Sequence, residues 1–296
     1  MRRDATGFGL AACLLWCGVI GVNRLVIAAL GPLRAGAVTM SLAGGAGLAL
    51  AAARGRLKSD LAGFSPAYLL ACGGCFLAYQ VCLLLAIGLA ADAGQVIVVG
   101  MLNYLWPALT LALGVPLLGY GASAWLPLGL AATLAGEALV VGGGLPSRAG
   151  FTWVYLLAVL AALAWALYSN LARRLARGAA GNAVPLFMAV CGLVLWPLAV
   201  LSDGPPRWSG TVAAAVLFVA LGPGLLAYSW WDRGMRQGRA KLLAVASYLI
   251  PLGSTAVTSL LWRAWPRPAV WLGAGLVLAG ALVCRGAVRA ADQDRA

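Results

Sequence analysis

Aromatic and amide side chains recur inside apolar stretches of this sequence, where they could hold a small molecule. Within a stretch they lie three, four or seven residues apart, as Trp16 and Asn23 do, and this spacing places them on one face of a helix. Aromatic rings stack on flat apolar groups, while amides and hydroxyls bond amino and carboxylate groups. The residues that we predict to line a shared cavity at mid-depth are Trp16, Asn23, Tyr79, Gln80, Asn103, Trp106, Trp165, Tyr168, Ser247, Tyr248 and Ser254.

The same side chains could instead pack helices against each other. Serine and threonine hydroxyls often bond across such contacts, and tryptophan and tyrosine gather at membrane interfaces. We favour packing for Ser254, and the cavity for Trp16, Tyr79, Asn103 and Trp165, which the sequence places nearer mid-depth.

Two prolines lie at corresponding places in two apolar stretches, Pro107 in one and Pro251 in the other. A proline removes one intrahelical hydrogen bond and kinks its helix, which frees a carbonyl group. We predict a kink or a hinge beside the cavity at both positions.

Charged residues inside the apolar stretches are rare. Glu137 is the only acid clearly inside one, and Arg24 is expected at a similar depth. Because an isolated buried charge is costly, we interpret the two as a structural ion pair. Proton coupling by Glu137, or binding of a substrate carboxylate by Arg24, is the alternative. Asp232 falls at a helix end beside Arg233, where we expect it to be solvated or paired.

Catalytic chemistry has little support in this sequence. An enzyme needs convergent acid, base or metal-binding groups, and the chain contains no histidine. Cys72 and Cys75 form a C-x-x-C pair, but the cysteines all fall in or beside apolar stretches and are interpreted as small apolar helix residues. We expect no enzyme activity, no metal and no cofactor.

The composition indicates a membrane protein. Of the 296 residues, 63% are hydrophobic and 10% are charged, which is too little charge to cover a soluble surface. About 20 apolar residues cross a bilayer core as a helix, and runs of that length recur along the chain. The net charge of +13 is also typical of nucleic-acid binders, but the basic residues lie between apolar runs rather than along one face. We therefore predict an all-α, polytopic protein of the bacterial inner membrane that binds lipid and no nucleic acid.

Ten apolar spans can be placed, five in each half of the chain. The predicted spans are Thr6–Ala29, Leu33–Ala53, Ser65–Leu89, Gly94–Leu113, Ser123–Gly143, Phe151–Leu171, Ala183–Leu201, Thr211–Trp231, Leu242–Trp262 and Pro268–Cys284. Fifteen of the 21 lysines and arginines then fall on the side of the two termini, and six fall on the other side. Positive charge is concentrated on the cytoplasmic side of membrane proteins, so both termini are predicted to be cytoplasmic.

The two halves repeat each other. Leu77–Gln80 matches Leu226–Ser229 at an offset of 149 residues, and Tyr104–Pro107 matches Tyr248–Pro251 at an offset of 144. A unit with an odd number of spans is inverted in its second copy, a plan common among secondary transporters. We predict two inverted five-helix repeats, residues 1–145 and residues 146–296.

These features resemble a known family. The tryptophan-rich first helix, the Leu-Ala-Tyr of the third span and the Tyr-Leu-x-Pro helices resemble the ten-helix, EamA-type members of the drug/metabolite transporter superfamily. The resemblance covers essentially the whole chain and is greatest to the bacterial aromatic amino acid exporters of the YddG type. It implies export of small metabolites, aromatic amino acids first, by alternating access between the halves, with the protein acting as a monomer or a homodimer.

Two other functions remain open from the sequence. Efflux of lipophilic cations, as by a broad-specificity drug transporter, would favour an acidic cavity, which a single buried acid supports poorly. A non-transporting scaffold or receptor is also possible, but it would leave the repeated polar stripes unexplained.

Overall fold

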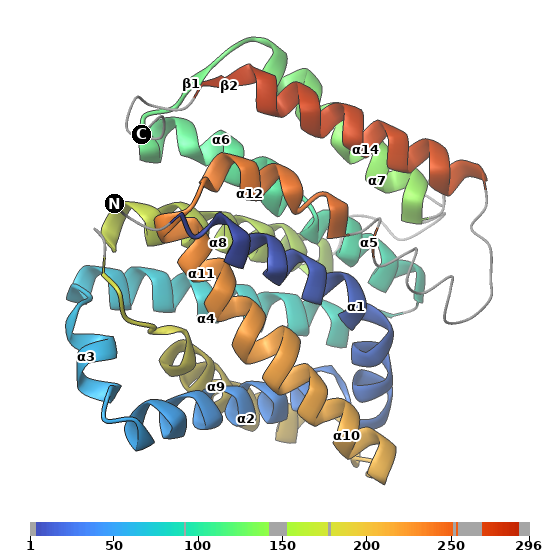
Figure 1. Ribbon diagram of the computed structural model, residues 1–296. Helices are drawn as coiled ribbons and strands as arrows, with labels where there is room; N and C mark the ends of the chain where they lie inside the picture. Colours follow the sequence, from blue (N-terminus) through green and yellow to red (C-terminus); the bar gives the residue numbers. More distant parts are fainter. Residues whose placement is uncertain are drawn as a thin grey trace.

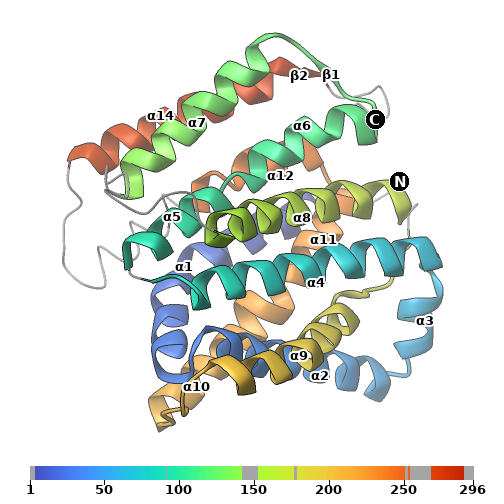
Figure 2. The same ribbon diagram turned by 180° about the vertical axis from the view of Figure 1, so that it is seen from behind.

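The computed structural model is a bundle of helices and describes residues 4–91, 93–141, 153–176, 179–250, 253 and 268–289 (Figures 1 and 2). Its helices are α1 (Thr6–Leu30), α2 (Pro32–Ala53), α3 (Leu57–Ala62), α4 (Pro66–Gly88), α5 (Ala93–Asn103), α6 (Trp106–Leu118), α7 (Trp125–Val141), α8 (Trp153–Leu175), α9 (Val184–Ser202), α10 (Gly210–Val219), η1 (Ala220–Leu226), α11 (Ala227–Gln237), α12 (Ala240–Ala246) and α14 (Pro268–Ala287). Two short strands, β1 (Gly121–Ala122) and β2 (Val288–Arg289), pair antiparallel. In Figure 1, α7 and α14 lie side by side at the top, and α2 and α9 lie at the bottom.

The lengths and the exteriors of the helices are those of a membrane protein. In the described part of the chain, α2, α4, α8, α9 and the run Gly210–Gln237 are long and apolar enough to cross a bilayer. The α1 helix joins them if its two straight parts, which meet at 56°, form one span. Leucines face outward, and Leu70 and Leu201 are 77% and 83% exposed. The predicted all-α, polytopic membrane fold is confirmed, while the count of ten spans stays a prediction.

Several of the predicted spans are irregular, two of them beside a proline. Gly94–Leu113 was predicted as one helix, but α5 ends at Asn103 and α6 begins at Trp106. Pro107 lies in the first turn of α6, where its missing N–H leaves no helical hydrogen bond unmade. The run from α10 to α11 passes through a π-helical segment, η1, that contains Pro223. Such segments widen a helix locally and are frequent at functional sites.

Glycines allow α7 and α14 to approach each other closely. A Cβ added to Gly136 would lie 2.7 Å from the carbonyl oxygen of Gly273, and one added to Gly280 would lie 2.7 Å from that of Gly129. Gly273 follows Gly129 by 144 residues, and Gly280 follows Gly136 by the same offset. Each of the two contacts therefore repeats the other with the roles of α7 and α14 exchanged.

The α2–α9 contact has the same reciprocal form. A Cβ on Gly44 would overlap the backbone of Ala189, and a Cβ on Gly192 would meet the Ser41 backbone N at 2.8 Å. Both glycines and both partners are 148 residues apart in sequence. Reciprocal contacts of this kind are those that a local twofold axis between two helices would produce.

The two ends of the bundle differ in charge. At the end that we call the basic end, the N-terminal turn of α1 meets the C-terminal end of α11, and the Arg239 N–H donates to Thr6 Oγ1 at 2.9 Å. The short helix α3 also lies there. At the opposite end, α1 gives way to α2, and the Arg207 N–H donates to the carbonyl of Ala29 at 2.8 Å.

Candidate substrate-binding cavity

A cavity of about 220 Å³ lies where α1, α2, α4, α8 and the α10–η1–α11 run meet the break between α5 and α6. Its polar and aromatic lining residues are Trp16, Asn23, Thr39, Tyr79, Gln80, Asn103, Tyr104, Trp106, Trp165 and Tyr228. Ile27 and Ile87, near the ends of α1 and α4, also line it, so the cavity extends from mid-bundle toward the opposite end. Pockets for drug-sized ligands are typically ~300–1,000 Å³, and this space is suited to a smaller molecule.

Trp165 is the centre of an aromatic wall. Its ring centroid lies 4.9 Å from that of Tyr79, 5.3 Å from that of Tyr228 and 6.1 Å from that of Trp16. The Tyr228 and Trp16 rings meet Trp165 edge-on, at 78° and 75°. Edge-to-face contacts of this kind are attractive beyond the area that they bury. The four rings come from α1, α4, α8 and α11, so they make a fixed surface out of four helices.

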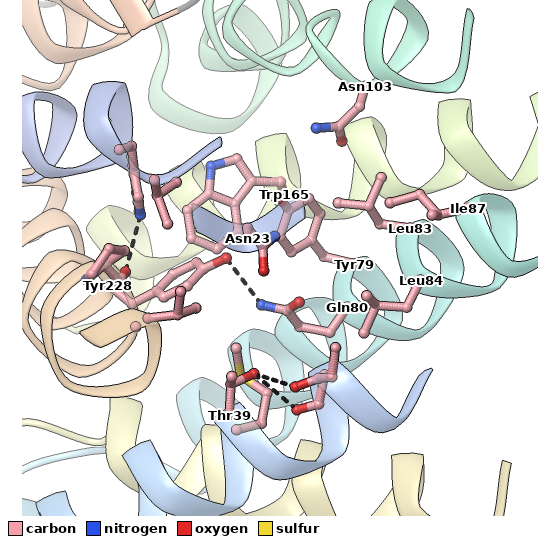
Figure 3. Close-up of a pocket in the computed structure, with 18 of the residues that line it drawn as sticks. Asn23, Thr39, Tyr79, Gln80, Leu83, Leu84, Ile87, Asn103, Trp165 and Tyr228 are labelled. Carbon is pink, nitrogen blue, oxygen red and sulfur yellow. Dashed lines mark hydrogen bonds between the residues drawn. The ribbon is translucent and has the colours of Figure 1, made fainter. Parts of the chain in front are cut away.

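Hydrogen bonds fix the polar groups of the wall. The Gln80 amide donates to the Tyr228 hydroxyl at 3.0 Å (Figure 3). The Trp16 indole N–H donates to the carbonyl of Pro223 at 3.1 Å, inside the π-helical segment. The Tyr79 hydroxyl interacts with Asn103. Polar side chains that could otherwise rotate are thereby held beside the rings.

Among the described residues, the side-chain oxygen of Asn103 is an unsatisfied hydrogen-bond acceptor. The atom is buried and has no hydrogen-bond partner among those residues. Such an atom costs free energy unless a ligand or a water supplies a donor. Asn103 is the last residue of α5, at the break in this span, and Figure 3 shows it across from Gln80.

The described lining of the cavity contains no aspartate, glutamate, lysine or arginine. A lone ionic ligand would therefore lose its hydration without gaining an opposite charge, which is costly. A zwitterion has no net charge, and amide and hydroxyl groups can both donate to it and accept from it. The electrostatics therefore favour a neutral or zwitterionic ligand.

Most of the predicted binding residues lie on these walls, and their role in binding stays a prediction. Those that line the cavity are Trp16, Asn23, Tyr79, Gln80, Asn103, Trp106 and Trp165. Tyr168 is fully buried behind the wall. The Ser247 hydroxyl donates to the Ala244 carbonyl at 2.7 Å, and Tyr248 is buried among Ala108 and its neighbours, so neither faces the cavity. Ser254 and Pro251 lie outside the described residues.

The described residues do not test the predicted ion pair between Arg24 and Glu137. Arg24 is exposed on the second part of α1. Glu137 lies on α7, which packs against α14, but its side chain is outside the described residues. The pair stays a prediction.

Asp232 was expected to be solvated or paired, and it is paired. Its side chain is fully buried and pairs with Arg236, one turn further along α11, rather than with the neighbouring Arg233. The predicted position at a helix end left solvation open, but α4 and α8 cover this part of α11. The spacing of four residues between Asp232 and Arg236 was the available signal, because it places both side chains on one helix face.

Tyr228 and Thr39 line the cavity and were absent from the predicted set. A signal for Tyr228 was present, since it follows Tyr79 by the repeat offset of 149. Thr39 had no such signal. Its hydroxyl donates to the Ala35 carbonyl within α2, at 2.7 Å, as threonines in ordinary membrane helices do.

The chain is similar to transporters over nearly its whole length. Residues 152–285 match the EamA-like transporter family. The aromatic amino acid exporter YddG of Salmonella typhimurium is 34% identical over 95% of this chain and 97% of its own length. The proteins of the same name from Escherichia coli and Ancylobacter novellus are 33% and 30% identical, over 96% and 95% of this chain and 97% of each relative. A crystal structure that is 29% identical superposes over 96% of both chains, with a TM-score of 0.78.

Proposed function

This chain belongs to the EamA-like transporter family, and we propose that the small molecules it exports are aromatic amino acids. It is a transporter rather than an enzyme, and a multi-pass protein of the bacterial inner membrane. Its family and its export of small molecules confirm the predictions made from the sequence. The substrate class is the part that we propose.

The observation that carries this proposal is an aromatic cavity whose described lining carries no charge. The Trp165, Tyr79 and Tyr228 rings offer stacking surfaces, and Gln80 and Asn103 offer amides beside them. An aromatic amino acid combines a flat apolar ring with an ammonium and a carboxylate group that balance each other. Stacking contributes ~0.5–1.5 kcal/mol beyond burial, enough to select a ring without trapping a molecule that must leave.

Efflux of lipophilic cations fits this cavity less well. Such a ligand would meet aromatic faces here, but the described lining offers no carboxylate to balance its charge. The modest volume of about 220 Å³ also argues against large drugs.

We further propose that the transporter has ten spans in two inverted halves, residues 1–145 and 146–296, with both termini in the cytoplasm. The reciprocal α7–α14 and α2–α9 contacts support this arrangement, because each joins two helices that the repeat relates. The excess of basic residues supports a cytoplasmic basic end. The cavity then extends toward the periplasm, as one state of an alternating-access cycle would. It is built within one chain, so a monomer suffices, whether or not the chain also forms a homodimer.

Ligand-dependent stability tests the substrate class. A ligand that binds the folded state raises its stability, by ~2.7 kcal/mol at a hundred times its Kd. We expect phenylalanine, tyrosine and tryptophan to raise the Tm of the detergent-purified protein, and alanine and tetraphenylphosphonium to leave it unchanged. A shift with the cation and none with the amino acids would contradict the proposal.

A further inference from the structure

On the basic side of the cavity, Asp232 and Arg236 of α11 form a buried ion pair. Arg236 Nε lies 2.7 Å from Asp232 Oδ2, and the side chains are 2% and 0% exposed, the arginine first. Tyr68 of α4 and Tyr168 of α8 both donate to Asp232 Oδ1 at 2.9 Å. The arginine also donates to the carbonyl of Gly181, between α8 and α9, at 2.8 Å. One pair of charges therefore ties three helices and a connection together.

Two stacked rings join this pair to the cavity. Trp165, on the cavity wall, stacks on Tyr168 with centroids 4.9 Å apart and planes 20° apart. Tyr168 in turn holds Asp232 through its hydroxyl. A ligand that moves Trp165 would therefore also move a group bonded to the carboxylate.

A second cavity lies on the other side of the pair, at the basic end. It has a volume of about 290 Å³, and Arg236, Asn182 and Ser229 line it. Arg56 and Arg233, both exposed, line the same cavity. Arg236 therefore faces a space that leads to the basic end, while Trp165, stacked on Tyr168, faces the first cavity.

The pair carries one positive and one negative charge, which makes it a match for a zwitterion. The two side chains belong to one turn of α11, so the bonds that close this end are those from the two tyrosines to Asp232 and from Arg236 to Gly181. Breaking these bonds would leave two buried charges without their polar partners, which is strongly unfavourable. An amino acid can prevent this, because its ammonium can replace the tyrosine hydroxyls at the carboxylate and its carboxylate can replace the Gly181 carbonyl at the guanidinium. A molecule with a single charge would leave one partner unpaired.

We propose that Asp232 and Arg236 are the cytoplasmic gate of the export path, and that the ammonium and carboxylate groups of the substrate open it by replacing the tyrosine hydroxyls at Asp232 and the Gly181 carbonyl at Arg236. Tyr68 and Tyr168 hold the gate closed by bonding to the carboxylate. This inference rests on the proposed function, which supplies an amino acid as the substrate and a cytoplasmic basic end.

Cys72 is a native reporter of the gate. It lies one turn from Tyr68 on α4 and is fully buried. In a protein that retains only this cysteine, Tyr168→Phe removes a hydrogen bond to Asp232 and keeps the ring. We expect labelling of Cys72 by a membrane-impermeant maleimide, from the cytoplasmic side of inside-out vesicles, to become about tenfold faster, equivalent to ~1.4 kcal/mol.

The matched control is Tyr155→Phe on the same helix. That hydroxyl is buried and has no hydrogen-bond partner among the described residues, so labelling of Cys72 should keep the wild-type rate. Asp232→Asn should accelerate labelling further, provided that the variant folds. A Tyr168→Phe protein that folds normally and labels at the wild-type rate would overturn the gate.

Labelling of Cys72 in the presence of ligands tests whether the gate recognises a zwitterion. The protein used here carries wild-type Tyr168 and Asp232. Phenylalanine on the cytoplasmic side should accelerate labelling of Cys72 severalfold, while phenylalanine amide, a cation, and 3-phenylpropionate, an anion, should not. If phenylalanine is transported but all three ligands act alike, zwitterion exchange is wrong and the proposed function stands. If phenylalanine is not transported but Tyr168→Phe still accelerates labelling, the gate stands and the proposed substrate is wrong.

Discussion

Replacing Trp16 with leucine should weaken transport of aromatic amino acids selectively. Trp16 lines the cavity and is only partly buried, whereas Trp165 is 2% exposed, so truncating Trp165 would also remove core packing. Leucine keeps an apolar side chain at position 16 but removes one stacking face. A substrate ring that loses one aromatic contact loses ~0.5–1.5 kcal/mol, or ~2- to ~13-fold in affinity.

The assay compares phenylalanine and alanine in proteoliposomes that contain equal amounts of folded protein. We expect the KM for phenylalanine to rise by that factor in Trp16→Leu, and the KM for alanine to change less than about twofold, because alanine has no ring to stack. The matched control is Trp196→Leu. The Trp196 indole N–H also makes a hydrogen bond, to Ser41 Oγ at 3.2 Å, but Trp196 lies 39% exposed on α9, away from the cavity. Equal losses for the two substrates, or no loss for either, would refute the stacking argument.

Three further changes test other parts of the structure. Gly136→Ala should lower the Tm in detergent, by the equivalent of ~1–3 kcal/mol of stability, because its Cβ would overlap the α14 backbone. Gly275→Ala, whose Cβ meets open space, should preserve the stability or raise it by up to ~1 kcal/mol. Similar Tm shifts in the two variants would show that α7 and α14 are not so close. If Glu137 only neutralises Arg24, Glu137→Gln should reduce expression and leave any pH dependence of transport intact, and loss of proton-dependent flux in a well-expressed variant would reveal coupling instead. Cysteine-accessibility labelling should find both termini in the cytoplasm and the loop around Arg148 in the periplasm; a periplasmic C terminus would contradict the ten-span topology.

Much of the cavity could be predicted because its residues are exceptional for a membrane helix. Trp16, Tyr79, Gln80, Asn103 and Trp165 are polar or aromatic at mid-depth, where lipid-facing positions are apolar, and the structure places all five on the cavity wall. Helical spacing decided which side chains share a face, and this is a local property of the sequence.

Other features depend on packing between distant segments, which spacing does not reveal. The sequence predicts a kink or a hinge at Pro107. It does not predict that α5 ends at Asn103 and that a turn precedes α6. The burial of Asp232 required α4 and α8 to cover the end of α11, and each contributes a tyrosine from far away in the sequence. Ser247 and Tyr248 directly follow α12, but they contact other helices rather than the cavity.

Counterflow of radiolabelled phenylalanine into proteoliposomes tests the central claim most directly. The purified wild-type protein, with unlabelled phenylalanine inside, should accumulate the label, and excess tyrosine or tryptophan should compete with it far better than alanine or tetraphenylphosphonium. Accumulation that only the lipophilic cation inhibits, or a complete absence of phenylalanine counterflow by folded protein, would contradict an exporter of aromatic amino acids.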